Sequence, residues 1–143
     1  MMLRLAGESD LPDLVALDGR SRAHAWTAAQ FADSLNAPHT QIWLAEQDGQ
    51  TVGLAVWQTV CEETELHLIV SDPAWRRRGL ASRLLAKLLD ETVAQGGNRV
   101  LLEVAAGNEA AQALYHAHGF VVTGRRAQYY ASGEDAVLME KTW

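Results

Sequence analysis

The sequence is poor in cysteine and in long apolar runs. Its single cysteine, Cys61, cannot form an internal disulfide and cannot make a zinc site alone. No apolar stretch approaches the roughly eighteen residues of a membrane-spanning helix, and Met1–Asp10 lacks the apolar core and cleavage site of a signal peptide. Eighteen acidic residues against twelve basic ones give a net charge of −6, which argues against coating nucleic acid with a basic face. We therefore expect a cytoplasmic protein that binds neither membrane nor nucleic acid.

What the sequence does have is enough apolar mass for one core. A hydrophobic content of 48% over 143 residues suits a single domain, here residues 1–143, without a structural metal or disulfide. The histidines do not suggest a metal site either. His116 and His118, spaced by two on a predicted helix, face different directions, and His67 lies apart in the sequence. We predict no bound metal.

Hydrophobic periodicity predicts a helix–strand alternation along the whole chain. Turn and cap residues set the boundaries: Ser9 as a helix N-cap with Pro12 in the first turn, Asp48-Gly49 as a hairpin turn, and Gly96-Gly97 as a helix end. The predicted strands are Met1–Ala6, Gln41–Glu46, Thr51–Val60, Glu65–Val70, Val100–Val104, Phe120–Arg126 and Asp135–Glu140, and the predicted helices are one after Ser9, Thr27–Leu35, Gly79–Gln95 and Asn108 to about His118.

This order places a helix between the strands Glu65–Val70 and Val100–Val104, which implies a parallel crossover within a mostly antiparallel sheet. Val100–Val104 is almost wholly apolar, which is typical of a strand covered on both faces. The predicted class is α+β, a mixed α/β sandwich.

Three arginines precede the longest predicted helix, in the run Arg76-Arg77-Arg78-Gly79-Leu80-Ala81. The first amide groups of a helix have no partner within it, and the helix dipole adds partial positive charge there. Small residues at Gly79 and Ala81 would let an anion approach the backbone closely. The run matches neither common nucleotide-loop motif. It indicates either a diphosphate site for another phosphate-bearing cofactor or a solvated basic turn.

The same run, Arg76-x-x-Gly79-x-Ala81, resembles the acetyl-CoA signature Q/R-x-x-G-x-G/A of the Gcn5-related N-acetyltransferases (GNAT family). The segment LLEVAAGNEAAQALYHAHGF, from Leu101 to Phe120, resembles the next block of that family. The tail RRAQYYASGEDAVLM, from Arg125 to Met139, and the shorter AHAWT, from Ala23 to Thr27, extend the resemblance to the bacterial ribosomal-protein-alanine acetyltransferases. One departure is that the segment near Trp26 lacks the family's proline, which bears on the substrate more than on the cofactor.

The resemblance implies a fold and a cofactor site. The fold would be a central, mostly antiparallel sheet with a splayed parallel pair and helices on both faces, and the cosubstrate would be acetyl-CoA. One strand would pair its backbone with the pantetheine arm, the arginine run would hold the pyrophosphate, and a helix start would reach the cofactor. The residues concerned are Ile69, Val70, Ser71, Arg76, Arg77, Arg78, Gly79, Leu80, Ala81, Ser82 and Asn108. From the residues alone, Ile69 and Val70 also fit a core strand, and Asn108 also fits a helix cap.

The resemblance likewise implies catalytic roles. Glu103 matches the proposed general base, acting directly or through water, and Tyr115 matches the general acid that protonates the CoA sulfur. Without the family, Glu103 fits a solvent-facing strand residue and Tyr115 an aromatic packed on the sheet. Trp26, Tyr129, Tyr130 and Glu134 would line the peptide site; the tyrosines also fit a mobile loop with surface aromatics.

The substrate implied is the N-terminus of a ribosomal protein, with alanine first. A single glutamate suits an α-amine, whose reference pKa is about 7.7–8.0, better than a lysine, whose pKa is about 10.4. Two alternatives stay open: an acetyltransferase for a small-molecule amine, and a non-catalytic sensor that binds acyl-CoA.

Overall fold

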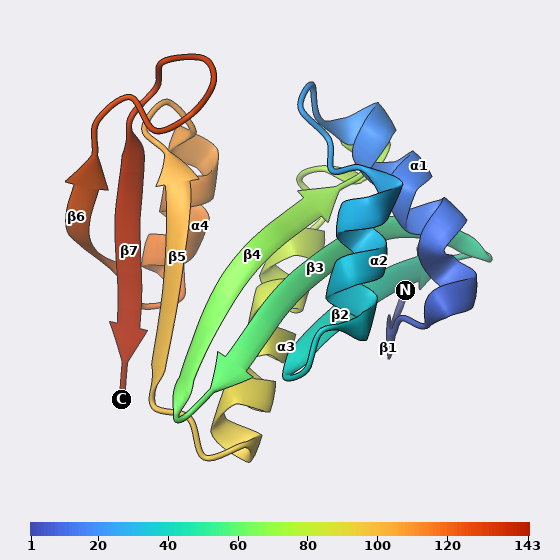
Figure 1. Ribbon diagram of the computed structural model, residues 1–143, viewed down its shortest axis with the longest axis horizontal. Coiled ribbons are helices and arrows are strands. Elements are labelled where there is room, and N and C mark those ends of the chain that lie inside the picture. Colours follow the sequence, from blue (N-terminus) through green and yellow to red (C-terminus); the bar gives the residue numbers. More distant parts are fainter. The chain divides into compact units, whose positions relative to one another are not determined.

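The computed structural model describes residues Met1–Trp143, which form two compact units. The first contains Met1–Gln58 and His67–Leu88, and the second contains Thr59–Leu66 and Leu89–Trp143. The elements, labelled in Figure 1, are β1 Met2–Leu5, α1 Leu11–Ser21, α2 Ala28–Asn36, β2 Thr40–Gln47, β3 Gln50–Val60, β4 Glu63–Ser71, α3 Leu80–Ala94, β5 Arg99–Ala105, α4 Glu109–Ala117, β6 Val121–Arg126 and β7 Ala136–Thr142, with short 3-10 turns at Glu8–Asp10 and Pro73–Trp75. The predicted order of strands and helices is confirmed.

The strands follow the order β1-β2-β3-β4-β5-β7-β6. β4 and β5 pair in parallel, whereas β1–β2, β2–β3, β5–β7 and β6–β7 pair in antiparallel fashion. The parallel register joins only Glu63–Glu65 to Arg99–Leu101, at the start of each strand. This is the mixed sheet with a briefly joined parallel pair that the family resemblance implies.

In the first unit, helices cover both faces of the sheet. The core on one face joins Leu14 and Leu17 of α1 and Phe31 of α2 to alternate residues of β2, β3 and β4. On the other face α3 approaches β3 so closely that a Cβ on Gly53 would lie 2.9 Å from Leu80 Cδ2. Gly53 therefore allows the first turns of α3 to pack directly on the strand.

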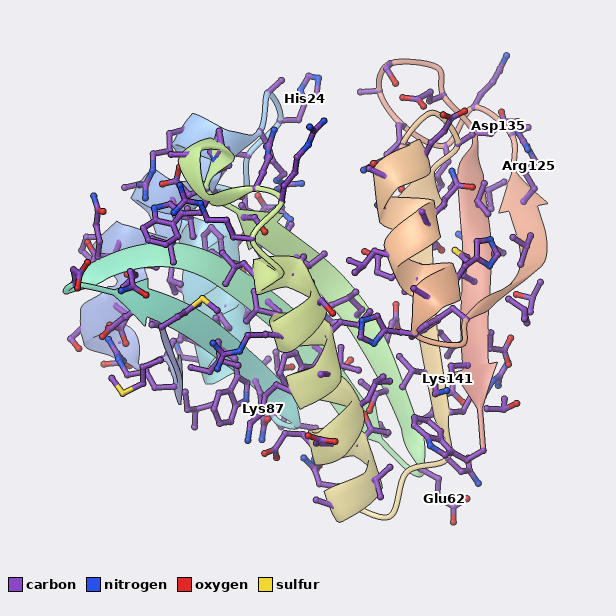
Figure 2. All side chains as sticks on the ribbon, turned by 180° about the vertical axis from the view of Figure 1, so that it is seen from behind. His24, Glu62, Lys87, Arg125, Asp135 and Lys141 are labelled. Carbon is purple, nitrogen blue, oxygen red and sulfur yellow. The ribbon has the colours of Figure 1, made fainter.

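In the second unit, α4 lies over β5 in both views (Figure 1, Figure 2). Burial along β5 alternates: Val100, Leu102 and Val104 are buried, whereas Glu103 is exposed. The prediction that Val100–Val104 is covered on both faces therefore fails at Glu103. Alternate strand residues point to opposite faces, and the face that carries the half-buried Leu101 and the exposed Glu103 is covered less completely than the other.

Local signals set most boundaries correctly. Asp48 and Gly49 adopt positive φ values of 52° and 76° in the β2–β3 turn, as a tight hairpin requires. Gly96 donates to the Val93 carbonyl and Gly97 to that of Thr92, which ends α3 as predicted.

The predicted N-cap Ser9 is wrong. Ser9 lies within a 3-10 turn, and α1 begins after Asp10. The Asp10 carboxylate accepts from the Gly7 amide and from Arg4, which explains the later start. No helix is both long and apolar enough to cross a membrane.

Candidate functional site

The segment between β4 and α3 is anchored within the first unit by Asp72. Its backbone amide donates to the Val52 carbonyl, and its carboxylate accepts from Ala74 N and Arg20 Nε, each at 2.9 Å. The Ala74 amide, with help from Arg20, holds the pKa of the Asp72 carboxyl below its usual value. Arg20 also donates to the Thr51 carbonyl, so α1, β3 and the end of β4 are tied together.

The backbone of this segment turns sharply before α3 starts. Arg77 and Gly79 have positive φ values of 66° and 76°, and the Gly79 carbonyl accepts from Arg83 N. Leu80 and Ala81 thus occupy the first turn, where amides precede the helical hydrogen-bond ladder. A Cβ on Gly79 would meet no atom within 4 Å, so glycine is required here by its φ angle and not by crowding.

The arginines surround this turn with exposed positive charge. Arg76 Nη2 donates to the Ser21 carbonyl at 3.1 Å, and the Arg78 guanidinium lies 4.7 Å from the centroid of the Trp75 ring. Arg76, Arg77 and Arg78 are all exposed. An open glycine, first-turn amides and three exposed guanidinium groups fit a diphosphate.

The strand leading into this segment is part of the core. Val70 is buried in the cluster with α1 and α2, and Ile69 and Ser71 are half-buried. The core interpretation of this strand is therefore confirmed for Val70. The backbone contacts predicted for Ile69, Val70 and Ser71 stay a prediction.

The second unit contains both predicted catalytic residues. The Glu103 side chain is 30% exposed on the less covered face of β5, where Arg126 Nη2 lies 3.4 Å from its Oε1. Tyr115, on α4, is 4% exposed and packs its ring against Phe120 with centroids 5.8 Å apart. Burial, with a smaller contribution from Tyr130, raises the pKa of Tyr115 to about 12. A tyrosine with the ordinary pKa of about 10 is already protonated at neutral pH, and the raised pKa leaves the Tyr115 phenol able to donate.

The β6–β7 loop carries the two predicted substrate tyrosines. Their rings meet edge to face with centroids 5.2 Å apart, and Tyr129 also lies 5.4 Å below the Arg126 guanidinium. Burial raises the pKa of Tyr130, and the negative charges of Glu103 and Glu134 add to the shift. The charges of Glu103 and Glu134 thus affect Tyr130, and Tyr130 in turn affects Tyr115.

Hydrogen bonds hold this loop at both ends. Glu134 Oε2 accepts from the Gly107 amide at 2.7 Å, and Ala106 N donates to the Asp135 carbonyl at 2.9 Å. The Asp135 carboxylate accepts from Arg125 Nε at 2.7 Å and from Gln128 N at 3.0 Å (Figure 2 labels Arg125 and Asp135). One carboxylate oxygen of Glu134 therefore already fixes the loop to the connection between β5 and α4.

The remaining predicted residues have structural partners of their own. Asn108 is the N-cap of α4, with Oδ1 accepting from Ala111 N at 3.1 Å, so its cap interpretation is confirmed. Trp26 lies in the first unit, in the α1–α2 loop, with its ring 5.2 Å from that of Phe31. Its amide donates to the buried Asp18, which is also paired with Arg22.

Sequence reasoning missed Arg126 and the buried Asp18–Arg22 pair. Arg126 lies in the RRAQYY segment, where strand alternation already separates it from Arg125. The structure contains no group of three or more histidine, cysteine, aspartate or glutamate side chains arranged to hold a metal ion.

This mixed sheet with its glycine-containing turn before α3 is the architecture of an acetyltransferase. The profile of the Acetyltransferase (GNAT) family matches residues 10–120, and the chain belongs to this family. Two curated relatives show what it resembles more narrowly. The "[Ribosomal protein bS18]-alanine N-acetyltransferase" of Escherichia coli K12 is 35% identical over 134 residues, covering 92% of this chain and 90% of the relative. The "N-alpha-acetyltransferase RimI" of Mycobacterium tuberculosis H37Rv is 42% identical over 121 residues, covering 81% of this chain and 75% of the relative.

A solved structure of a relative has the same fold. The crystal structure of the ribosomal-protein-S18-alanine N-acetyltransferase from Escherichia coli superposes with a TM-score of 0.93 at 33% identity, covering 99% of this chain and 92% of that one.

Proposed function

We propose that residues 1–143 act as one catalytic domain that transfers an acetyl group from acetyl-CoA to the N-terminal α-amine of a protein. The substrate we favour is a small-subunit ribosomal protein that begins with alanine. The observation that carries this proposal is similarity along nearly the whole chain to relatives named for that reaction, in sequence and in fold. We propose that the reaction takes place in the cytoplasm.

For acetyl-CoA, the segment Arg76–Ser82 would bind the pyrophosphate. The fit rests on the open backbone at Gly79 and on the exposed arginines around it. The backbone of Ile69–Ser71 would pair with the pantetheine arm. Asn108 would contact the cofactor through a group other than its Oδ1, because that oxygen already caps α4.

In the second unit, Glu103 and Tyr115 would perform the proton transfers. The bound ammonium first loses one proton to water; the neutral α-amine nitrogen then attacks the thioester carbonyl carbon and gives up its second proton to Glu103, directly or through water. The C–S bond then breaks, and the sulfur takes the proton of the Tyr115 hydroxyl. The Tyr115 phenol is protonated at neutral pH and so can supply this proton; burial, by raising its pKa to about 12, makes it a weaker acid than an exposed tyrosine. Proton return from Glu103 to Tyr115 through solvent closes the cycle.

The charge around this chemistry favours a peptide N-terminus. Glu103 and Glu134 lie close enough to Tyr130 to affect its pKa, so an incoming ammonium group would meet two carboxylates beside aromatic rings. At pH 7 about a tenth of α-amino groups are neutral, against fewer than about one lysine side chain in a thousand. A site with one weak base would therefore select the α-amine. In the second unit, Tyr129 and Tyr130 would contact the first residues of the peptide. Trp26, in the first unit, is proposed as a substrate residue from the family resemblance.

A substrate panel tests the proposal. The enzyme and acetyl-CoA are incubated with an Ala-starting peptide, the same peptide blocked at its N-terminus, a polyamine and free alanine, and release of the CoA thiol is followed. We expect turnover on the free peptide alone. Turnover only on the polyamine or free alanine would favour a small-amine acetyltransferase. Calorimetric CoA binding without turnover on any amine would favour a non-catalytic sensor.

A further inference from the structure

Arg126 places a positive charge at the proposed base. Its Nη2 lies 3.4 Å from Glu103 Oε1, and its guanidinium carbon lies 5.4 Å from the centroid of the Tyr129 ring. A carboxylate and an aromatic face are two groups that together bind a cation. The chain's own arginine thus occupies a cation site built from Glu103 and Tyr129.

The same two groups are those we propose for the substrate amine. An unreacted peptide N-terminus is mostly an ammonium ion at neutral pH because its pKa is about 7.7–8.0. An ammonium ion needs the Glu103 carboxylate, which the Arg126 guanidinium already contacts. A carboxylate oxygen can accept from two donors, but the positive charge of Arg126, with Nη2 3.4 Å from Glu103 Oε1, repels an ammonium ion brought to the same carboxylate.

The ion pair between Arg126 and Glu103 is weak enough for a substrate cation to replace Arg126. The Arg126 side chain is 56% exposed and that of Glu103 is 30% exposed, so solvent screens their attraction. Their separation of 3.4 Å is longer than that of a charge-assisted hydrogen bond, which is about 2.7–2.9 Å. By contrast, Asp18, which holds the Trp26 loop, is fully buried and lies 2.6 Å from Arg22 Nε. A partly exposed, long contact can be released into solvent at low cost.

We propose that Arg126 is a resident competitor for the substrate-ammonium site, which the N-terminal ammonium of the peptide displaces when it binds to Glu103 and Tyr129. This inference rests on the proposed function and adds to it a residue that sets the affinity of the site for amines. Arg126 would weaken the binding of every amine by a similar factor, so a substrate would need further peptide contacts to bind at low concentration.

The test compares steady-state kinetics of wild type and Arg126→Gln on an Ala-starting peptide. Competition is relieved in the variant, so we expect KM for the peptide to fall about two- to fivefold, the range for a partly exposed ion pair. We expect kcat to stay unchanged because Arg126 has already left Glu103 in the substrate complex. Adding methylguanidinium at about 0.1–0.5 M to the variant should raise KM again, since an ion pair of this strength does not form at millimolar guanidinium, and potassium chloride at the same ionic strength should have a smaller effect.

Two further variants separate competition from a general effect of charge or folding. Lys141→Gln removes the same charge from the far end of β7, where the ammonium lies 5.3 Å from the Trp143 ring (Figure 2 labels Lys141), and should leave KM unchanged. Arg126→Lys keeps the charge and should keep KM close to that of wild type. If Arg126→Gln does not fold, Arg126→Met, which also removes the charge and keeps an apolar stem, takes its place with the same expected fall in KM.

The kinetic results either support or overturn the competitor role of Arg126. An unchanged or raised KM in Arg126→Gln, an equal fall in Lys141→Gln, or a lower kcat with unchanged KM would overturn the competitor role. If wild type acetylates no peptide at all, it is the proposed function that has failed. If wild type is active and only the KM effect is missing, the proposed function stands without this inference.

Discussion

Replacing Tyr115 with phenylalanine removes one oxygen atom and little else. The ring is 4% exposed and packs against Phe120, and phenylalanine keeps both the volume and that contact. The variant therefore isolates the hydroxyl that we propose as proton donor to the CoA sulfur. We expect the variant to fold and to bind CoA as wild type does.

The expected kinetic loss follows from general acid catalysis. A positioned acid contributes about 10²- to 10⁴-fold to rate, so kcat on an Ala-starting peptide should fall by about that factor in Tyr115→Phe. A pKa of about 12 also means that Tyr115 stays protonated across the working range, so its ionisation should not limit wild-type kcat below pH 11.

A second readout of the same substitution is stability at alkaline pH. The pKa of Tyr115 rises from 10.0 to about 12 on folding, so between these values the native state holds a proton that the unfolded chain releases. The free energy of unfolding should therefore fall by about 2–3 kcal/mol as pH rises from 10 through 12, and the contribution is complete below pH 10. Tyr115→Phe should lack this part of the alkaline loss.

The assays are steady-state acetylation with CoA release, calorimetric CoA binding, and urea unfolding from pH 8 to pH 12. A kcat within twofold of wild type would refute the acid role of Tyr115, whatever the unfolding curves show. Equal alkaline losses in the two proteins would refute the burial argument for its pKa and leave the kinetic question open.

Three further substitutions, one of them with a matched control, test other parts of the account. Glu103→Gln should lower kcat on the peptide by about 10²- to 10⁴-fold at pH 7, and a pH–rate profile should show the defect shrinking above about pH 8, where the α-amine deprotonates unaided; a defect constant with pH would contradict the base role. Gly79→Ala forces a non-glycine residue to a φ of 76°, so it should lower stability by about 1–2 kcal/mol and weaken CoA binding. The control Gly49→Ala, at the same φ in the β2–β3 turn, should lower stability by a similar amount and leave the calorimetric CoA affinity intact. Equal CoA affinities in the two variants would count against the pyrophosphate site. Asp18→Ala leaves the Arg22 guanidinium without its buried partner and should lower the urea-unfolding free energy by about 2–4 kcal/mol; a stability equal to wild type would show that the pair is dispensable.

Much of the fold could be predicted because its signals are local. Asp48-Gly49 and Gly96-Gly97 specify positive φ angles through their own residue types, and Asn108 caps α4 through a bond three residues away. These features depend on neighbours in the sequence, so they can be recognised without knowing the tertiary structure.

The errors and omissions depend on distant contacts. The apolar content of Val100–Val104 predicts a strand covered on both faces, but it does not show which face the rest of the chain packs on. Arg126 meets Glu103 across 23 positions, and Glu134 meets the Gly107 amide across 27. No local pattern indicates such pairs. Family resemblance brought Glu103 and Glu134 forward, but it did not show that each already has a partner in the chain.

The central claim is that the acetyl group goes to an α-amine and not to a side chain. The most direct measurement uses one peptide that begins with alanine and contains an internal lysine, incubated with enzyme and acetyl-CoA and analysed by fragmentation mass spectrometry. We expect one added acetyl group, located on the N-terminal nitrogen, with the lysine unmodified. An acetyl group on the lysine, or a peptide that stays unmodified while CoA is bound, would contradict the account.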